Sequence, residues 1–309
     1  MRVLFWGSPE FAVKPLEAIL ASSHRVVGVV CHPDRPRGRG RKVSAGEVKM
    51  FAGSRGLTLL HPEIPRGEEF LSELRSLKPD ISVVVAYGHI LRPEVLCVPC
   101  HGSINLHASL LPAYRGAAPI QRAIAAGERS TGLTVIRMDE GMDTGPILAR
   151  RRVGIGPEET AGELAGRLSE LGARLLVEVL DQIADKGLEP VSQPQEGVSY
   201  APKTSPEEAR LDWNLPAHKI SCLVRAFDPA PGAYCFRSGS ILKLFRAVPQ
   251  ERQAGKPGEI VACSQKGVVV SCGDSRGVLV REIQAQGKKR MAACDYLCGA
   301  RMEPGEVLD

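Results

Sequence analysis

The sequence lacks a long hydrophobic run at its N-terminus. Four apolar residues stand between Arg2 and Gly7, too few for the core of a signal peptide or for a membrane span. Internal repeats and low-complexity tracts are also missing from the 309 residues, so a repeat array is not expected. We therefore expect a protein that stays in the cytoplasm and has no membrane partner.

The cysteines do not suggest a disulfide framework. Nine of them, an odd number, are scattered from Cys31 to Cys298, which is typical of reduced thiols that serve as small hydrophobes. The segment Cys97–His101 has the Cys-x-x-Cys-His spacing of covalent haem attachment. That chemistry requires export, and a zinc site would require two more ligands, for which Cys294 and Cys298 are candidates. We expect structural thiols and no bound metal.

The composition is that of an ordinary globular protein, with 43% hydrophobic and 24% charged residues. The length suggests two domains. A net charge of +5 is mild, but its distribution is uneven. One cluster comprises Arg35, Arg37, Arg39, Arg41 and Lys42, and a second comprises Lys288, Lys289 and Arg290. Such clusters are either solvated surface or contacts to a polyanion such as nucleic acid.

Apolar runs alternate with helical patterns in the first half of the chain. The runs are 2–6, 26–31, 81–86 and 103–106, and helical spacing occurs at 11–21 and around 48–52. Continuous β-branched runs that alternate with helices indicate a mostly parallel sheet with helices on both faces. The fold class we predict is therefore α/β and Rossmann-like.

A long helix is expected to close this first domain. Thr160 and Glu163 form a capping-box pattern ahead of regularly spaced apolar residues, and Gly187 stands where a C-terminal cap belongs. Residues 189–206 show no periodicity and are rich in Pro, Gln, Ser and Gly, which predicts a linker. Strand patterns at 241–245, 259–262, 268–272 and 278–283 follow a helix at 216–227 and predict a small antiparallel, OB-like β-barrel. The expected domains are 1–188 and 207–309.

Two polar side chains end the apolar run at 103–106. Asn105 and His107 are two residues apart, so in a strand they point to the same face. They lie at the carboxyl end of the strand, where open α/β sheets bind ligands. A simpler interpretation is a capped strand and a hydrogen-bonded core histidine. Similarly, the acidic loop 139–143 is either part of a site or only a turn.

Longer motifs around these residues favour a site. The segments 105–112, 114–119 and 139–145 read Asn-Leu-His-Ala-Ser-Leu-Leu-Pro, Tyr-Arg-Gly-Ala-Ala-Pro and Asp-Glu-Gly-Met-Asp-Thr-Gly. In this order they resemble the folate-dependent formyltransferases. The similarity runs end to end and includes the segments 6–12, 33–40, 85–88, 200–203 and 209–213.

The resemblance implies an activity and roles for residues. Within the family the chain is most similar to the members that transfer the formyl group of 10-formyltetrahydrofolate to methionyl-tRNA for translation initiation. It implies Asn105, His107 and Asp143 as the catalytic residues. It implies a folate site of Ser109, Leu110, Leu111, Pro112, Tyr87, Gly88, Ile90, Leu91, Asp139 and Gly141. It implies tRNA contacts from both basic clusters and from Lys203, and we expect a monomer.

Two alternatives follow from the same residues. One is a formyltransferase that acts on a small amine, which would share the 105–143 core but would lack both basic loop 33–42 and the basic C-terminal domain. The other is a non-catalytic RNA-binding protein, which the intact catalytic residues disfavour. The sequence departs from the family pattern at Ala113, where Arg is frequent, and at Ala230, where Trp is common.

Overall fold

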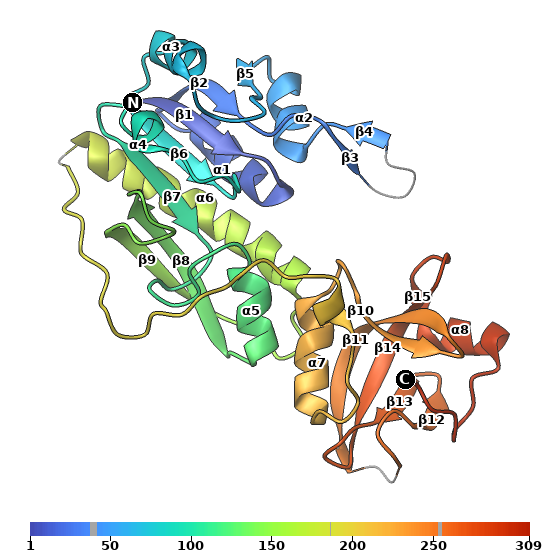
Figure 1. The fold of residues 1–309 in the computed structure, drawn as a ribbon. Coiled ribbons are helices and arrows are strands. Elements are labelled where there is room, and N and C mark those ends of the chain that lie inside the picture. Colours follow the sequence, from blue (N-terminus) through green and yellow to red (C-terminus); the bar gives the residue numbers. More distant parts are fainter. Residues whose placement is uncertain (38–41, 186, 253–254) are drawn as a thin grey trace. The chain divides into compact units, whose positions relative to one another are not determined.

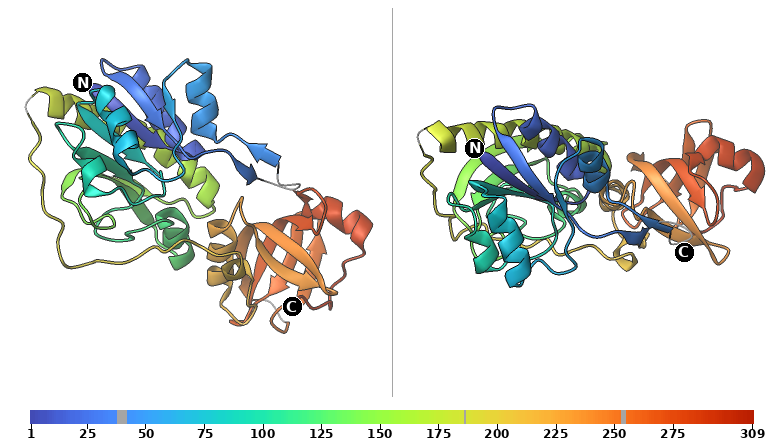
Figure 2. Two further views of the ribbon diagram at one scale, coloured as in Figure 1. Left: turned by 45° about the horizontal axis from the view of Figure 1, so that its top comes forward. Right: turned by 90° about the horizontal axis from the view of Figure 1, so that it is seen from above.

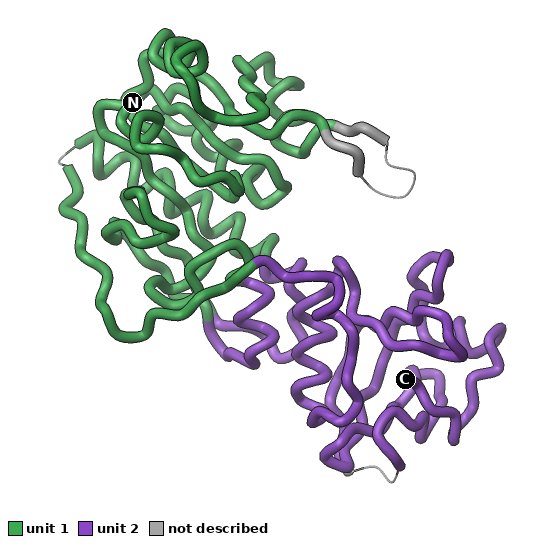
Figure 3. Tube along the Cα trace, in the orientation of Figure 1, with its two compact units in different colours: residues 1–119, 131–153, 165–202 green, residues 120–130, 154–164, 203–309 purple. Residues whose placement is uncertain are grey.

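A computed structural model describes residues 1–37, 42–185, 187–252 and 255–309. It contains two compact units (Figure 3). Unit 1 comprises Met1–Pro119, Thr131–Val153 and Ala165–Pro202, and unit 2 comprises Ile120–Ser130, Gly154–Leu164 and Lys203–Asp309. The division passes through helices α5 (Pro119–Ala126) and α6 (Ala161–Asp185). The domain limits expected from the sequence, 1–188 and 207–309, stay a prediction.

Unit 1 is built on a seven-stranded sheet in the order β5-β2-β1-β6-β7-β8-β9 (Figure 1). The pairs from β5 to β7 are parallel, and β8 is antiparallel to β7. The strands are β1 (Arg2–Gly7), β2 (Arg25–Val30), β5 (Leu59–Leu60), β6 (Ile81–Val85), β7 (Ser103–His107), β8 (Ser130–Arg137) and β9 (Ile147–Gly154). The predicted mostly parallel, Rossmann-like sheet is confirmed.

Helices cover both faces of this sheet. Leu4 and Trp6 of β1 belong to a buried cluster with Phe70 and Leu74 of α3 (Glu68–Ser76) and Val95 of α4 (Pro93–Leu96). The other face carries α1 (Val13–Leu20) and α6, which lie on the side of the sheet away from the cyan α4 (Figure 2). Unit 1 also contains α2 (Glu47–Ser54).

Packing against α6 decides which way the side chains of β7 point. A Cβ added at Gly172 of α6 would lie 2.6 Å from the side chain of Leu106, so Leu106 faces α6. Because side chains alternate along a strand, Asn105 and His107 face away from α6. Ser103 on the same side donates to the Leu96 carbonyl of α4 at 3.1 Å.

The start of α6 is capped as the sequence predicts. Glu163 Oε2 accepts from the Thr160 backbone N–H at 3.0 Å, and Thr160 Oγ1 accepts from the Glu163 N–H at 3.3 Å. These reciprocal bonds satisfy two of the donors that a helix start leaves without partners.

Unit 2 contains an antiparallel sheet in the order β10-β11-β14-β13-β12, with β15 paired to β14. Its elements are α7 (Ala217–Ala226), β10 (Ala233–Arg237), β11 (Ser240–Arg252), β12 (Ile260–Ser264), β13 (Gly267–Ser271), β14 (Arg276–Ala285), β15 (Met291–Ala292) and α8 (Ala293–Ala300). Apolar residues of α7 and of strands β10 to β14 form its core, among them Ile220, Val268 and Val280. An all-antiparallel second domain is therefore confirmed.

The described residues of the first basic cluster lie in two short paired strands that the sequence did not predict. Strands β3 (Arg35–Arg37) and β4 (Lys42–Ser44) pair antiparallel, with Arg35 opposite Ser44 and Arg37 opposite Lys42. Arg39 and Arg41 lie outside the described residues. Over the described part of the chain, none of the helices has the length and apolarity that a membrane crossing requires.

Candidate active site

Asn105, His107 and Asp143 converge within unit 1. Asn105 Nδ2 donates to Asp143 Oδ1 at 3.2 Å, and His107 Nδ1 lies 3.5 Å from Asp143 Oδ2. The side chains of His107 and Asp143 are 6% and 14% exposed, so water only weakly screens the electrostatic interaction between them. The structure thus brings together the three residues that the sequence selected from two separate motifs.

The hydrogen bond on the far side of the imidazole fixes its tautomer. His107 Nε2 lies 2.9 Å from the carbonyl oxygen of Tyr114. A carbonyl only accepts, so Nε2 carries a hydrogen in both charge states. Nδ1, beside Asp143, is consequently the atom that gains or loses a proton.

Asp143 is held in an unusual backbone conformation. Its φ is 56°, a left-handed value that is uncommon outside glycine. Its Oδ2 accepts from the Gly116 backbone N–H at 2.8 Å. Gly116 itself has φ 122°, and a Cβ there would lie 2.8 Å from the Ala201 carbonyl oxygen. Only glycine fits at this position, because both its conformation and its contact exclude a side chain.

The predicted folate loop after β7 is pinned by Thr134 of β8. The Thr134 hydroxyl donates to the Ser109 carbonyl at 2.7 Å and accepts from the Leu111 N–H at 3.1 Å. Leu111 is fully buried beside Ile136, and Ser109 Oγ donates to the Ala113 carbonyl at 2.6 Å. The loop backbone is therefore rigidly placed at the carboxyl end of the sheet, where Leu110 and Pro112 also lie.

The part of the predicted folate site that follows β6, residues 87–91, has buried and exposed side chains. Tyr87 and Leu91 are each 2% exposed, whereas Ile90 is 76% exposed. The Tyr87 ring lies edge-on to Trp6 with centroids 5.2 Å apart, and burial raises the pKa of its hydroxyl. Gly88 adopts φ 80°. The side chains of Tyr87 and Leu91 thus belong to the core, which leaves the backbone and Ile90 to meet a ligand.

The acidic loop 139–145 is internally bonded. Asp139 Oδ1 accepts from the Gly141 N–H at 3.1 Å and from the Thr144 hydroxyl at 2.7 Å. A Cβ at Gly141 would lie 2.0 Å from Thr144 Oγ1. Asp139 and Gly141 therefore shape the loop that presents Asp143, and the loop is more than a solvated turn.

The basic residues differ in their surroundings. Lys203, Lys288 and Lys289 are exposed. Arg290 donates to both oxygens of the buried Asp228 at 2.7 and 3.1 Å, pairs with Glu282, and lies 4.0 Å from the Phe245 ring centroid. Its guanidinium is therefore engaged within unit 2, in contrast to the two lysines before it.

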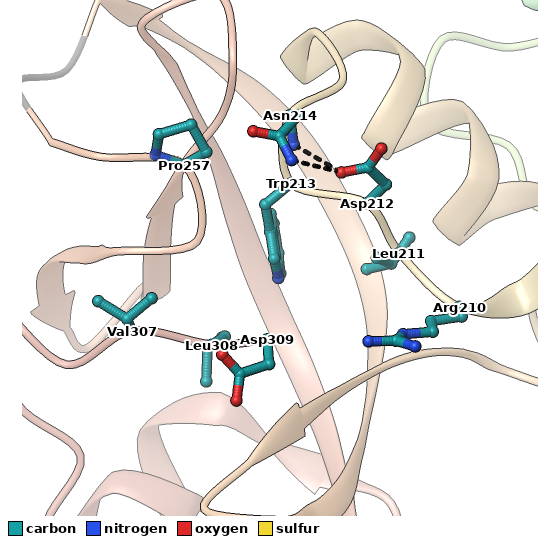
Figure 4. Close-up of a pocket in the computed structure, with 9 residues that line it drawn as sticks. All are labelled: Arg210, Leu211, Asp212, Trp213, Asn214, Pro257, Val307, Leu308 and Asp309. Carbon is teal, nitrogen blue, oxygen red and sulfur yellow. Dashed lines mark hydrogen bonds between the residues drawn. The ribbon is translucent and has the colours of Figure 1, made fainter.

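Outside the predicted site, a metal ion would need a cluster of ligating side chains, and another ligand would need a hollow in the described structure. Among the described residues, no three His, Cys, Asp or Glu side chains form a group suited to a metal ion. A hollow of about 450 Å³ in unit 2 is lined by Arg210, Leu211, Asp212, Trp213, Asn214, Pro257, Val307, Leu308 and Asp309 (Figure 4). None of the predicted site residues is in its lining, so it is separate from the catalytic constellation.

Three contributors to the site were not selected from the sequence. They are the Tyr114 carbonyl, the Gly116 N–H and Gln193, whose side chain donates to the Asp143 carbonyl at 2.8 Å. Tyr114 and Gly116 contribute through backbone atoms, which every residue type has. Apart from the glycine at 116, the sequence therefore gives no indication of their role. Gln193 lies in a segment without periodicity.

The fold and the site define the class of protein. Residues 1–180 match the family described as formyl transferase, and residues 203–301 match the formyl transferase C-terminal domain. The chain belongs to the formyl transferase family, and within it to the methionyl-tRNA formyltransferases, on the identities that follow. It is 43% identical over 99% of its length to the methionyl-tRNA formyltransferase of Geobacter metallireducens and covers 97% of that protein. It is 46% identical over 99% of its length to that of Magnetococcus marinus and covers 98% of it.

Solved structures share the fold at lower identity. HypX from Aquifex aeolicus in complex with tetrahydrofolic acid superposes with a TM-score of 0.66 at 20% identity, over 96% of this chain and 47% of that one. Methionyl-tRNA formyltransferase from Clostridium thermocellum superposes with a TM-score of 0.58 at 15% identity, over 92% and 98%. These structures confirm the fold, and the family matches and the identities to the curated relatives confirm the expected family.

Proposed function

We propose that the chain transfers the formyl group of 10-formyltetrahydrofolate to the α-amino group of methionyl-initiator tRNA, giving N-formylmethionyl-tRNA for translation initiation. The observation that carries this proposal is the convergence of Asn105, His107 and Asp143 in a chain that is 43–46% identical to methionyl-tRNA formyltransferases from end to end. It acts in the cytoplasm, where charged tRNA is found, and as a monomer.

The amine that attacks needs little activation. An α-amino group has a pKa of about 7.7 to 8.0, so a sizeable neutral fraction exists at pH 7. Its lone pair adds to the formyl carbon, and the carbonyl electrons move onto oxygen. The bond from that carbon to the folate nitrogen then breaks, while one proton leaves the amine and one joins the folate nitrogen. Catalysis therefore centres on the oxyanion and on these two protons.

Asn105 and His107 serve the oxyanion. One Nδ2 hydrogen of Asn105 is bonded to Asp143, which leaves the second for the substrate oxygen. His107 donates from Nδ1 when protonated, because its Nε2 hydrogen is already bound to Tyr114. Oxyanion donors and positioned acids each contribute roughly 10² or more in rate.

Asp143 orients His107 and relays the amine proton through a water. Its two oxygens already accept from Asn105 and Gly116, and each keeps lone-pair capacity for a further donor. In this role the carboxylate connects the imidazole that shuttles a proton with the amine that loses one.

The proposal also assigns the substrate contacts. Residues 109–112, the backbone of 87–91, Asp139 and Gly141 hold the folate. Arg35, Arg37, Arg39, Arg41, Lys42, Lys203, Lys288 and Lys289 contact tRNA, whereas the guanidinium of Arg290 is held by Asp228 and Glu282. Exposure of Lys203, Lys288 and Lys289 supports their assignment.

A direct assay tests this function. Purified protein is mixed with 10-formyltetrahydrofolate and methionyl-initiator tRNA, and formylmethionyl-tRNA is quantified. Charged elongator tRNA and a free amino acid serve as control acceptors. We expect product from the initiator tRNA alone at substantial rate, and an absence of product from it would overturn the proposal.

A further inference from the structure

The segment that leads out of unit 1 is bonded along the catalytic loops. Residues 191–201, here called the strap, were expected to be part of a linker. Val191 and Ile147 exchange two backbone hydrogen bonds of 2.8 and 2.7 Å. The Ala201 N–H donates to the Arg115 carbonyl at 2.7 Å, and the Ala201 carbonyl accepts from the Ala118 N–H at 3.0 Å. The strap therefore has defined attachment points on both sides of the site.

Between these attachments, Gln193 reaches the acidic loop. Its Nε2 donates to the carbonyl oxygens of Asp143 at 2.8 Å and Gly145 at 2.7 Å. Its Oε1 accepts from Arg115 Nε at 3.2 Å and from an Arg115 terminal nitrogen at 2.6 Å. Two carbonyls can only accept and a guanidinium can only donate, so this orientation of the amide is the only one that satisfies every partner.

These bonds act where the loop is strained. A left-handed backbone at a residue other than glycine persists only where its surroundings determine it. The Asp143 carboxylate is held from one side by Asn105 and Gly116. Gln193 holds the Asp143 backbone from the other side. Without Gln193, the φ of 56° would lose a main restraint on the peptide that follows Asp143.

We infer that Gln193 is a positioning residue for catalysis, which keeps the Asp143 carboxylate beside His107 and is itself held by Arg115. The inference rests on the proposed roles of Asp143 and His107. A displacement of about 1 Å at a reacting group costs up to about 10² in rate, so the two amide hydrogens of Gln193 have a large effect without touching substrate.

Two substitutions distinguish the effect of the Nε2 donors of Gln193 from the effect of its Oε1 acceptor. Gln193→Ala removes all four hydrogen bonds. Gln193→Glu keeps an oxygen for Arg115 and nearly the same volume, but it cannot donate to the two carbonyls and places a negative charge against them. The matched control is Gln195→Ala, two residues along the same strap, where the side chain is exposed.

The kinetic readout is kcat, KM for the folate donor, and the pH dependence of kcat. We expect both Gln193 variants to lower kcat by roughly 10- to 100-fold, with KM changed less than about threefold and a displaced pH profile. Gln195→Ala should stay within about twofold of the wild type. A Gln193→Glu variant with wild-type kcat would overturn the inference, because the carbonyl contacts would then be dispensable.

A second readout does not depend on catalysis. Amide hydrogen exchange of residues 139–145 should speed up by roughly tenfold in Gln193→Ala and Gln193→Glu and stay unchanged in Gln195→Ala, with the thermal midpoint unaltered. Unchanged exchange in both Gln193 variants would refute the positioning role. If the wild type forms no formylmethionyl-tRNA, the proposed function fails while this measurement still reports the hold of Gln193 on the loop.

Discussion

At the scale of residues, the two ring nitrogens of His107 and the two carboxylate oxygens of Asp143 each have a different partner. The Tyr114 carbonyl keeps a hydrogen on His107 Nε2 at 2.9 Å, so the exchangeable proton is on Nδ1. Gly116 and Asn105 donate to the Asp143 carboxylate, whose Oδ2 lies 3.5 Å from that nitrogen. An imidazole that is free to rotate or change tautomer would present a proton to the substrate only part of the time.

Replacing the carboxylate tests the proton relay. Asp143→Asn keeps the shape of the side chain but removes its charge and one acceptor, so we expect kcat to fall by roughly 10² to 10⁴ and the pH–rate profile to change. The control is Glu140→Gln, an exposed residue of the same loop. Near-normal turnover with an unaltered profile would rule the relay out.

At the scale of elements, β7 and the loops after it could be predicted, because strand alternation and a rare sequence motif both point to Asn105 and His107. Helix α6 was also recognisable from its capping box and apolar spacing. The strap was not recognisable, since its bonds to Asp143 and Arg115 use backbone atoms and one glutamine, which leave no periodic pattern. The left-handed Asp143 likewise depends on contacts from distant parts of the chain.

The capping box gives a pH-dependent stability prediction. A hydrogen bond from Arg246, with those from Thr160, lowers the pKa of Glu163 to about 2 from its ordinary 4.5. A lowered folded-state pKa stabilises the fold above the unfolded value and loses that stabilisation as pH falls toward the folded value. We therefore expect Glu163→Gln to reduce the free energy of unfolding by about 0.5–1 kcal/mol at pH 7, because the pair is partly exposed.

That difference should shrink between pH 4.5 and pH 2. Urea unfolding of the wild type, Glu163→Gln and Glu170→Gln over this range provides the comparison. Glu170 is an exposed residue of the same helix, and its substitution changes the net charge equally. A Glu163→Gln penalty that persists unchanged at pH 2 would contradict the linkage.

At the scale of the whole molecule, the proposed catalytic residues lie in unit 1 and the second basic cluster lies in unit 2. A net charge of +5 is too small to direct a polyanion by itself. We therefore propose that recognition of tRNA depends on local cations such as Lys288 and Lys289, which are exposed. The sequence alone showed that these residues form a charge cluster. It could not show which of the cationic side chains are already paired within the protein.

The salt dependence of tRNA binding distinguishes free from paired cations. Each phosphate contact contributes roughly one unit to the slope of log affinity against log salt. We expect the double substitution of Lys288 and Lys289 by Ala to reduce that slope by roughly two units while the fold stays stable. Arg290→Ala should instead lower stability by on the order of 2 kcal/mol, because the buried Asp228 loses its partner.

Filter binding across a salt series and urea unfolding measure these two effects. An unchanged slope in the double variant would remove Lys288 and Lys289 from the tRNA interface. A reduced slope in Arg290→Ala at unaltered stability would instead show that its guanidinium meets phosphate rather than holding unit 2 together.

The most direct test of the account is single-turnover formyl transfer by His107→Gln. The glutamine amide can still donate to the Tyr114 carbonyl from a position close to Nε2, but it has no titratable atom beside Asp143. We predict that formylation of methionyl-initiator tRNA slows by at least about 10², with tRNA and folate affinities within about twofold of the wild type. A transfer rate close to that of the wild type would contradict the assignment of His107 and, with it, of the site.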